Sequence, residues 1–471
     1  MKPIHLPVAE LKPALNGLGK IINVKSAVPI LLQVKVERTS EGWIALTATD
    51  LDRFVTVRFE HPSEGPPLAV LIPFDQLAQI TKKSGRDESL IIEVNSPADV
   101  MIRFALADNL GGSKVKALPI EEFPTTPRIK ADGIPLPAEI RRSIREAMDC
   151  ASVDSTRYIL NGAFIDTSNP KACYIVGTDG KHLYSANSFT LPLRNSVIIP
   201  SHKFLGWKEF NLDGEWQIKA DEVAVQLSTR RWRFISKQIE GNYPNWRQTI
   251  PDPNEAKTRI TINPDKLEDI NKLIQRIPCH DSDKFNTIGL EWKQGQFLLL
   301  GKDSPEEPWT RVPVLDVKGE GPEVTIFINR RFLTKAFDYG LNAIALINDI
   351  SCLRFHNLGR QMIVMPLRPE GGNPQPPAVP VIHSSPSAST PPHKPMISSP
   401  TPEAPLPHGP KTPVEEAIDM TLQIRDKLNE GFNLLRDLSI KLKGINRDHK
   451  NSAKDLQSVR STLRQLQVMK F

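Results

Sequence analysis

The chain has 471 residues, of which 39% are hydrophobic, and it carries a formal net charge of +6 at neutral pH. This length predicts three or four domains with ordinary cores, and the small positive charge weakly favours an anionic partner. The four cysteines are widely separated with no Cys-x-x-Cys, and no apolar run approaches the roughly 20 residues of a membrane span, so we expect a soluble intracellular protein without a zinc ribbon or a disulfide scaffold.

Short helices and strands are predicted throughout the first part of the chain. A helix opens at 8–12, 137–141 and 264–268, and a second helix follows an aliphatic strand end at 71–77, 198–204 and 327–332. Alternating or aliphatic patterns predict strands between them, which include 31–37, 43–48, 90–94, 172–176, 223–227 and 296–300.

These elements recur in the same order about 128 residues apart, a period the size of a domain. Thr49 and Asp50 lie between the two helices of the first copy and recur as Thr178 and Asp179, whereas the third copy keeps only Asp303. Each copy therefore predicts an α+β domain in which two helices pack against antiparallel sheet. The predicted domains span residues 1–127, 128–252 and 253–369.

The chain changes character after this repeat. Residues 370–413 are dominated by Pro, Ser and Thr and predict an extended, disordered linker. Residues 414–471 carry two apolar series in steps of seven, which predict a helical tail forming a coiled coil or an αα-hairpin. We prefer the hairpin, folded at 444–452, because both series fail there together.

Basic side chains fall in or near the six predicted helices. They fit a surface that contacts DNA phosphates without base specificity, or else an ordinary solvated face of mixed charge, since acidic residues share the same helices. The repeat favours the DNA interpretation. The side chains selected as phosphate contacts are Lys20, Lys25, Lys82, Lys83, Lys114, Arg141 and Lys203.

No residue pattern predicts catalysis. Asp179 and His182 suit acid–base chemistry, but a Thr-Asp-Gly turn between two strands explains that motif more simply. The segment 17–20 lacks the spacing of a phosphate-binding loop, and 111–114 is interpreted as a turn between strands. No cluster has metal-ligand spacing, so we expect neither an enzyme nor a bound metal or other cofactor.

Six motifs along the first 368 residues resemble those of one family. They are KSAVPIL at 25–31, LTATDL at 46–51, RYILNG at 157–162, TDGKHL at 178–183, IEGNYPNWR at 239–247 and IVMPLR at 363–368. Together they resemble the bacterial DNA sliding clamp, the beta subunit of DNA polymerase III.

This resemblance implies a cytoplasmic, non-catalytic processivity factor with no membrane contact. A head-to-tail homodimer would form a ring with helices inside and strands outside, would encircle double-stranded DNA, and would tether the replicative DNA polymerase and the clamp loader. We expect the dimer contact to join 101–107 to 277–285. The resemblance also implies a pocket for partner peptides between the second and third domains, lined by Leu160, Thr178, Gly180, His182, Leu183, Pro244, Gln248, Thr249, Ile363, Val364, Met365, Pro366, Leu367 and Arg368.

The chain departs from the family pattern in three places. Lys181 and His182 stand where the family usually has His-Arg, Gln248 stands where Arg is common, and Pro369 begins an extension where the family usually ends. The alternative hypothesis is therefore a clamp-like paralogue that serves as an interaction scaffold with weak or no loading on DNA. For the tail, three hypotheses stay open: it binds an unknown protein, self-associates, or covers the pocket.

Overall fold

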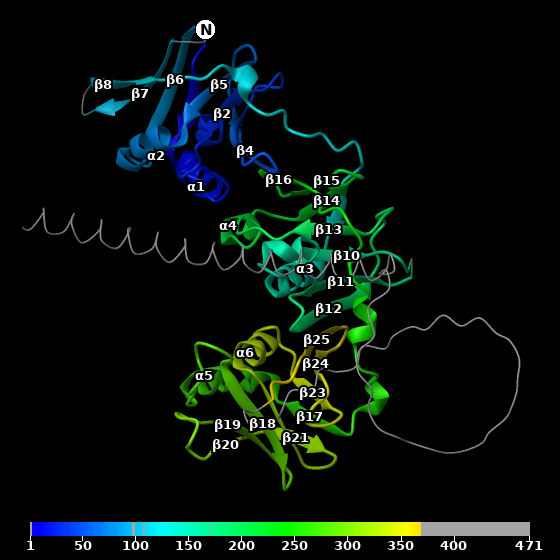
Figure 1. Cartoon of the computed structure of the whole chain (residues 1–471). Coiled ribbons are helices and arrows are strands. Elements are labelled where there is room, and N and C mark those ends of the chain that lie inside the picture. The colour runs from blue at the N-terminus through cyan, green and yellow to red at the C-terminus, as the bar shows by residue number, and fades with distance from the viewer. Residues whose placement is uncertain (1, 97–98, 107–108, 170, 369–471) are drawn as a thin grey trace, which may run out of the picture. The chain divides into compact units, whose positions relative to one another are not determined.

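The computed structural model describes residues 2–368, except for 97–98, 107–108 and 170 (Figure 1). The predicted linker and helical tail lie outside these described residues. Within them, the threefold repeat predicted from the sequence appears as three successive sets of strands and helices, which we call the first, second and third repeats.

The first repeat begins with a strand that leads directly into a helix. Pro7 and Pro73 occupy the N-cap positions of its two helices, where a proline ends the strand ladder because it has no N–H to donate. The elements are β1 (Ile4–Pro7), α1 (Val8–Leu18), β2 (Gln33–Arg38), β3 (Trp43–Thr49), β4 (Arg53–Pro62), β5 (Leu68–Pro73), α2 (Phe74–Lys83), β6 (Ser89–Ser96), β7 (Asp99–Leu106) and β8 (Asn109–Val115).

The second repeat follows the same order. Its helix α3 buries Ile140, Ile144, Ala147 and Cys150, which lie on one face at helical spacing. The elements are β9 (Ile134–Leu136), α3 (Ala138–Cys150), the 3₁₀ helix η3 (Ser155–Leu160), β10 (Gly162–Asp166), β11 (Cys173–Thr178), β12 (His182–Phe189), β13 (Val197–Pro200), α4 (Lys208–Leu212), β14 (Trp216–Ala220), β15 (Ala224–Ser228) and β16 (Trp232–Lys237).

The helix expected to follow 198–204 is the main correction to the predicted elements. The chain instead makes turns over 203–206, and α4 has only five residues beginning at Lys208. Phe204 and Leu205 are fully buried within these turns, and Gly206 weakens a helix here.

The third repeat has one additional strand, β21, which pairs with β17. Its elements are β17 (Thr258–Ile262), α5 (Leu267–Arg276), β18 (Thr287–Lys293), β19 (Gln296–Gly301), β20 (Thr310–Val314), β21 (Val317–Glu320), β22 (Val324–Asn329), α6 (Arg330–Asp338), β23 (Ala343–Leu346), β24 (Leu353–Asn357) and β25 (Arg360–Val364). Short 3₁₀ helices also occur at Pro29–Leu32, Ile120–Glu122, Trp246–Thr249, Pro253–Glu255 and Pro264–Lys266.

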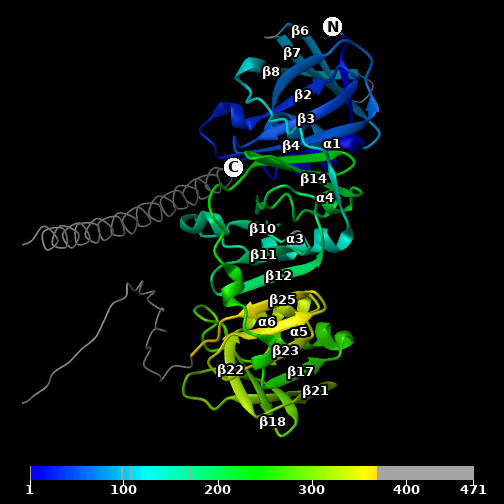
Figure 2. The ribbon, with the colours of Figure 1, turned by 90° about the vertical axis from the view of Figure 1, so that its right-hand side faces the viewer.

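The strands form four antiparallel sheets, two of which run from one repeat into the next. Their orders are β5-β2-β3-β4-β16-β15-β14-β9, β13-β10-β11-β12-β25-β24-β23-β17-β21, β1-β6-β7-β8 and β20-β19-β18-β22. Pairing of β4 with β16 joins the first and second repeats, and pairing of β12 with β25 joins the second and third. Figure 2 shows these two seams as continuous stacks of strands.

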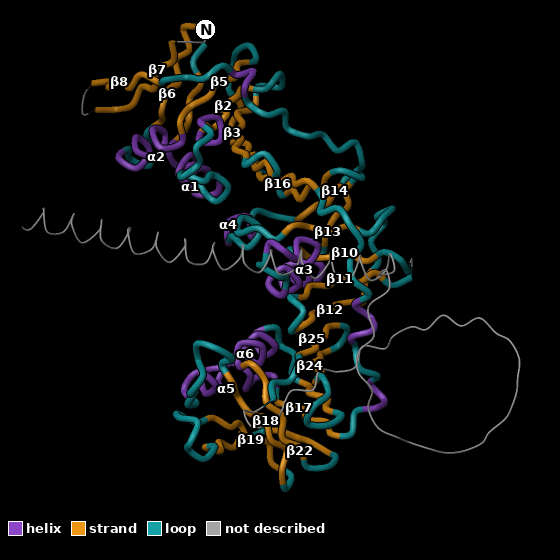
Figure 3. The backbone as a smooth tube through the Cα atoms, viewed as in Figure 1, coloured by secondary structure: helices purple, strands orange, loops and turns teal. Residues whose placement is uncertain are grey.

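The six α-helices of the described residues lie together on one side of these seam-spanning sheets (Figure 3). The main core lies between helices and sheets and runs through all three repeats. The structure therefore has a helix-lined face and, opposite it, a strand face. Side chains along each seam strand point alternately to the helix-lined face and to the strand face. No helix of the described residues is long and apolar enough to cross a membrane.

One prediction about the first repeat is also wrong. Residues 111–114 lie inside strand β8 and do not form a turn. Residues 101–106, part of the expected dimer contact, belong to β7, which lies between β6 and β8. The edge strand is β8.

Candidate functional site

Several residues of the predicted partner pocket lie at the seam between β12 and β25. Leu183 pairs with Ile363 in this antiparallel ladder, and both side chains point to the strand face. There they form a small apolar cluster with Val176 and Trp246, separate from the main core. The structure thus brings together residues that are 180 positions apart in the chain, since Leu183 and Ile363 are direct partners.

The segment between the second and third repeats covers this cluster. Tyr243 stacks on Phe164 with 4.4 Å between ring centroids. Trp246 donates its indole N–H to the Oδ2 atom of Asp166 at 3.0 Å. Three predicted pocket residues, Pro244, Gln248 and Thr249, lie on this segment and are exposed.

The turn between β11 and β12 forms a second border of the site. Thr178 Oγ1 donates to the carbonyl of His182 at 2.6 Å, and Gly180 adopts a positive φ of 84°, which favours glycine. Arg157 donates from Nη1 to the carbonyl of Asp179 at 3.1 Å, which holds η3, and Leu160 at its end, beside this turn. The turn interpretation of this motif is therefore confirmed.

The last described residues complete the site. The backbone N–H of Met365 donates to the carbonyl of Lys181 at 3.0 Å, and the Met365 side chain is 51% exposed. Its sulfur lies 3.1 Å from the Sγ atom of Cys352. Leu367 donates its N–H to the carbonyl of Phe327 at 2.6 Å, which ties this end of the segment to β22. Pro366 is half-buried and Arg368 is exposed.

Two of the predicted pocket residues lie on the other face. His182 stacks on Phe332 of α6 with 4.2 Å between centroids, and its side chain is 3% exposed. Its Nδ1 atom lies 2.8 Å from Asp179 Oδ1, and its pairing partner Val364 is fully buried in the main core. The reason is strand alternation: consecutive residues of one strand cannot all line the same face.

The structure adds residues that the sequence prediction did not select. Asp166 and Arg247 form an ion pair of 2.7 Å, and the Arg247 guanidinium lies 4.4 Å from the Trp246 ring centroid. Burial alone would raise the pKa of Asp166, but the hydrogen bonds from Ser168 and Trp246 and the charge of Arg247 hold that pKa below its usual value. In the sequence, the only indication of a role for Asp166 was a charged residue at the end of a strand.

The predicted DNA contacts occupy varied positions. Lys82 and Lys83 are exposed in the last turn of α2, Lys25 is exposed in a loop, and Lys114 is exposed on β8. Lys20 lies over the Trp207 ring at 5.5 Å. Lys203 is exposed, whereas the Arg141 side chain donates to the carbonyl of Gly214 at 3.1 Å.

Two arginines beside Arg141 are better placed on the helix-lined face. Arg142 and Arg145 are exposed on α3 and line, with Lys203 and His202, a cleft of about 670 Å³ shared between α3, the 203–206 turns and the end of α6. Burial lowers the pKa of His202 to about 4, so the ring is neutral at physiological pH. The cleft therefore presents three cationic side chains beside the carboxylates of Glu146, Asp149 and Asp338.

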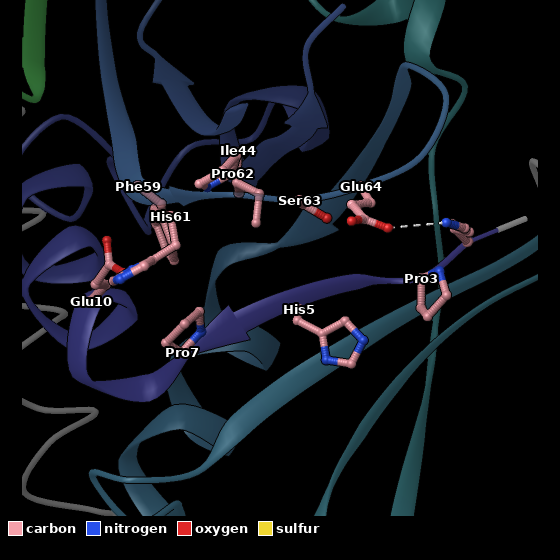
Figure 4. Close-up of a pocket in the computed structure, with 11 residues that line it drawn as sticks. Pro3, His5, Pro7, Glu10, Ile44, Phe59, His61, Pro62, Ser63 and Glu64 are labelled. Carbon is pink, nitrogen blue, oxygen red and sulfur yellow. Dashed lines mark hydrogen bonds and ion pairs between the residues drawn. The ribbon is translucent and has the colours of Figure 1, made fainter. Parts of the chain in front are cut away.

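A separate hollow of about 350 Å³ lies in the first repeat, between β1 and the end of β4 (Figure 4). Prolines 3, 7 and 62 form much of its wall, and His61 Nδ1 lies 3.0 Å from Glu10 Oε1, a contact that raises the pKa of His61. None of the predicted site residues lies here. Among the described residues no group of His, Cys, Asp and Glu is arranged to hold a metal ion.

Known proteins resemble this chain in sequence and in structure. No protein-family model matches the chain. The beta sliding clamp of Pseudomonas putida is 22% identical over 329 residues, covering 67% of this chain and 84% of the relative. That of Streptococcus pneumoniae serotype 4 is 26% identical over 361 residues, covering 72% and 90%. The crystal structure of the DNA polymerase sliding clamp from Bacillus subtilis has a TM-score of 0.67 at 20% identity, covering 78% of this chain and 99% of that one. The resemblance predicted from the motifs and the α+β clamp fold are confirmed.

Proposed function

We propose that this chain, which resembles the bacterial beta sliding clamps in sequence and has their fold, is a DNA sliding clamp. It would encircle duplex DNA without reading its sequence and would hold the replicative polymerase on the template. The role is non-catalytic and places the protein in the cytoplasm. Its three domains would span 1–127, 128–252 and 253–369, followed by the linker and tail.

The pairing of the seam strands is the observation that carries this proposal. In both internal seams, the third strand after a repeat's first helix pairs with the last strand of the next repeat: β4 with β16, and β12 with β25. The corresponding strands at the ends of the series are β20 and β8, which are edge strands of the described sheets. Pairing β20 of one chain with β8 of another would repeat the same junction.

Such a junction is heterologous, so it closes into a ring when the rotation per repeat permits. Two chains supply six repeats, as in the head-to-tail dimer implied by the family. The surfaces beside these edges support the contact. Leu106 and Leu110 near β8 are 61% and 65% exposed, and Phe285 in the third repeat is 40% exposed. Lys114 and Lys116 near β8 complement Glu306 and Glu307 near β20 in charge.

The helix-lined face would then surround the DNA. Exposed cations there, including Lys82, Lys83, Arg142, Arg145 and Lys203, can neutralise phosphates without fixed geometry. The strand face would carry the partner pocket at the β12–β25 seam, where Leu183, Ile363 and Met365 offer apolar contacts to a peptide anchor. The replicative polymerase and the clamp loader are the proposed partners.

Retention on DNA after loading tests the ring. A clamp stays on nicked circular DNA and slides off linear DNA of the same length, because its hold is topological. Equal loss from both molecules would contradict the ring and would favour the alternative of a clamp-like scaffold. The affinity of the full chain for a peptide carrying the clamp-binding segment of a bacterial replicative polymerase tests the pocket independently.

A further inference from the structure

The covering segment of the partner pocket is held by one buried carboxylate. Asp166 ends β10, and its side chain is 4% exposed. Its Oδ1 atom accepts the backbone N–H of Ser168 at 3.0 Å. Its Oδ2 atom accepts the indole N–H of Trp246 at 3.0 Å and an Arg247 N–H at 2.7 Å. Both oxygens are therefore engaged, and one of them binds two consecutive residues of the covering segment.

Trp246 and Arg247 hold the covering segment in place from its buried side. Trp246 packs with Leu183 and Ile363 in the apolar cluster at the seam. Arg247 spans the rings of Trp246 and Tyr174, with its guanidinium carbon 4.4 Å and 5.1 Å from their centroids. Asp166 thus sets the position of a tryptophan that contacts seam residues from both β12 and β25.

We infer that Asp166 is a positioning residue for the partner pocket, acting through Trp246 and Arg247 on the segment that carries Pro244, Gln248 and Thr249. This inference rests on the proposed function, because it concerns the same pocket. Asp166 itself is buried beneath the segment, so a bound peptide would be affected by the placement of the wall and not by the carboxylate directly.

The second repeat offers a matched control. Asp213 is equally buried, with its side chain 2% exposed. It accepts the backbone N–H of Arg231 at 2.7 Å and its guanidinium N–H at 3.0 Å, as well as the hydroxyl of Thr229. Arg231 lies at the other seam, near Glu60 of the first repeat. Losing either carboxylate removes a buried, arginine-paired group, but only Asp166 supports the pocket.

The experiment measures peptide affinity and thermal stability of the full chain for D166A, D166N and D213A. The probe is a fluorescent peptide carrying the clamp-binding segment of a bacterial replicative polymerase. We expect D166A to weaken peptide binding about tenfold and D166N about threefold, since Asn keeps an acceptor for Trp246 but loses the charge for Arg247. D213A should lower the melting temperature comparably while its peptide affinity stays within about twofold of wild type. If D166A does not fold, the peptide affinity of D166N is compared with that of D213A instead.

A double-mutant cycle with W246F separates positioning from general stability. Phenylalanine removes the indole N–H, so D166A should cost about threefold or less in peptide affinity on that background. An unchanged peptide affinity in D166A and D166N, or the same tenfold loss with and without Trp246, would overturn the inference while leaving the proposed function intact. A wild-type chain that does not bind the peptide would instead overturn the proposed pocket, and this inference with it.

Discussion

Glu146 and Arg360 form a buried ion pair across the seam between the second and third repeats, with Arg360 Nη1 3.0 Å from Glu146 Oε1. Their side chains are 9% and 14% exposed. Glu146 also accepts the hydroxyl of Tyr184 at 2.5 Å, so one carboxylate on α3 holds β12 and β25 together on the helix-lined face. The same two strands carry Leu183 and Ile363 on the opposite face.

Replacing Arg360 should therefore destabilise this seam. In R360M the carboxylate of Glu146 stays buried without its main cation, and we expect the free energy of unfolding to fall by about 3 kcal/mol. Denaturant titration of the full chain measures this loss. R142M is the matched control, because Arg142 lies 4.0 Å from the same carboxylate but is 53% exposed, so its loss should cost no more than about 0.5 kcal/mol. Equal losses in the two variants would contradict the importance of the buried pair.

Stability should decline in mildly acidic solution because of His202. Burial lowers the pKa of its ring to about 4 in the folded chain, whereas the unfolded chain binds a proton near pH 6.5. Between these values the unfolded state binds more protons, so stability falls as the pH decreases from about 6.5 to about 4, by up to about 3 kcal/mol. The neutral ring also accepts the backbone N–H of Phe204 at 3.2 Å.

The variant H202Q tests this assignment through unfolding curves at successive pH values. Its stability should vary less than that of wild type in this window. Asp179 affects stability in a separate, more acidic pH range. Burial opposes its ionisation, but hydrogen bonds and charge from His182 outweigh burial and lower the pKa of Asp179 to about 2. Its contribution to folding stability is therefore lost only below about pH 4. A wild-type profile that is flat from pH 6.5 to 4 would contradict the buried neutral state of His202.

The proposed junction between β20 and β8 predicts a specific monomerising substitution. Leu110 lies on β8 and is 65% exposed, so L110D should place a charge in the contact and weaken dimerisation by about tenfold or more. Sedimentation velocity over a concentration series measures the effect. L212D alters a leucine that is 72% exposed at the end of α4, away from either edge strand, and should leave the dimer unchanged. A dimer that tolerates L110D would place the contact elsewhere.

The three cationic side chains of the cleft beside α3 are predicted to contribute to DNA affinity. R142Q, R145Q and K203Q should each weaken binding to a short linear duplex and reduce the slope of log affinity against log salt by up to about 0.9. R141Q should have a smaller effect because its guanidinium is already bound to the carbonyl of Gly214. Fluorescence anisotropy at several salt concentrations compares the four variants, and an R141Q effect as large as that of R142Q would contradict the cleft.

The repeat and most helices were predictable because local patterns specify them. The pocket was predictable only in outline. A sequence motif consists of consecutive residues, but consecutive side chains of a strand point to opposite faces of the sheet. Leu183 therefore faces the apolar cluster, whereas its neighbour His182 faces α6. The role of Asp166 depends on a partner 80 positions away, and no local pattern in the sequence encodes that distance. Residues 111–114 show the opposite error, since glycines that resemble a turn lie in a strand.

Gly17 provides the last test, because its role appears only in the packing of two repeats. It lies inside α1, where glycine costs roughly 1 kcal/mol relative to alanine. A Cβ at this position would lie 2.3 Å from a ring carbon of Trp232 and 2.6 Å from one of Trp207, both in the second repeat. The glycine therefore permits the close approach of α1 to these aromatic rings.

G17A should consequently lower the free energy of unfolding by about 1–3 kcal/mol, even though alanine is the better helix former. G206A is the control, because the nearest atom to its added Cβ would be 3.9 Å away and its backbone conformation is ordinary. That variant should be neutral or slightly stabilising in the same denaturant titration. Stabilisation by G17A would mean that helix propensity outweighs packing and that the two repeats do not meet closely at Trp207 and Trp232.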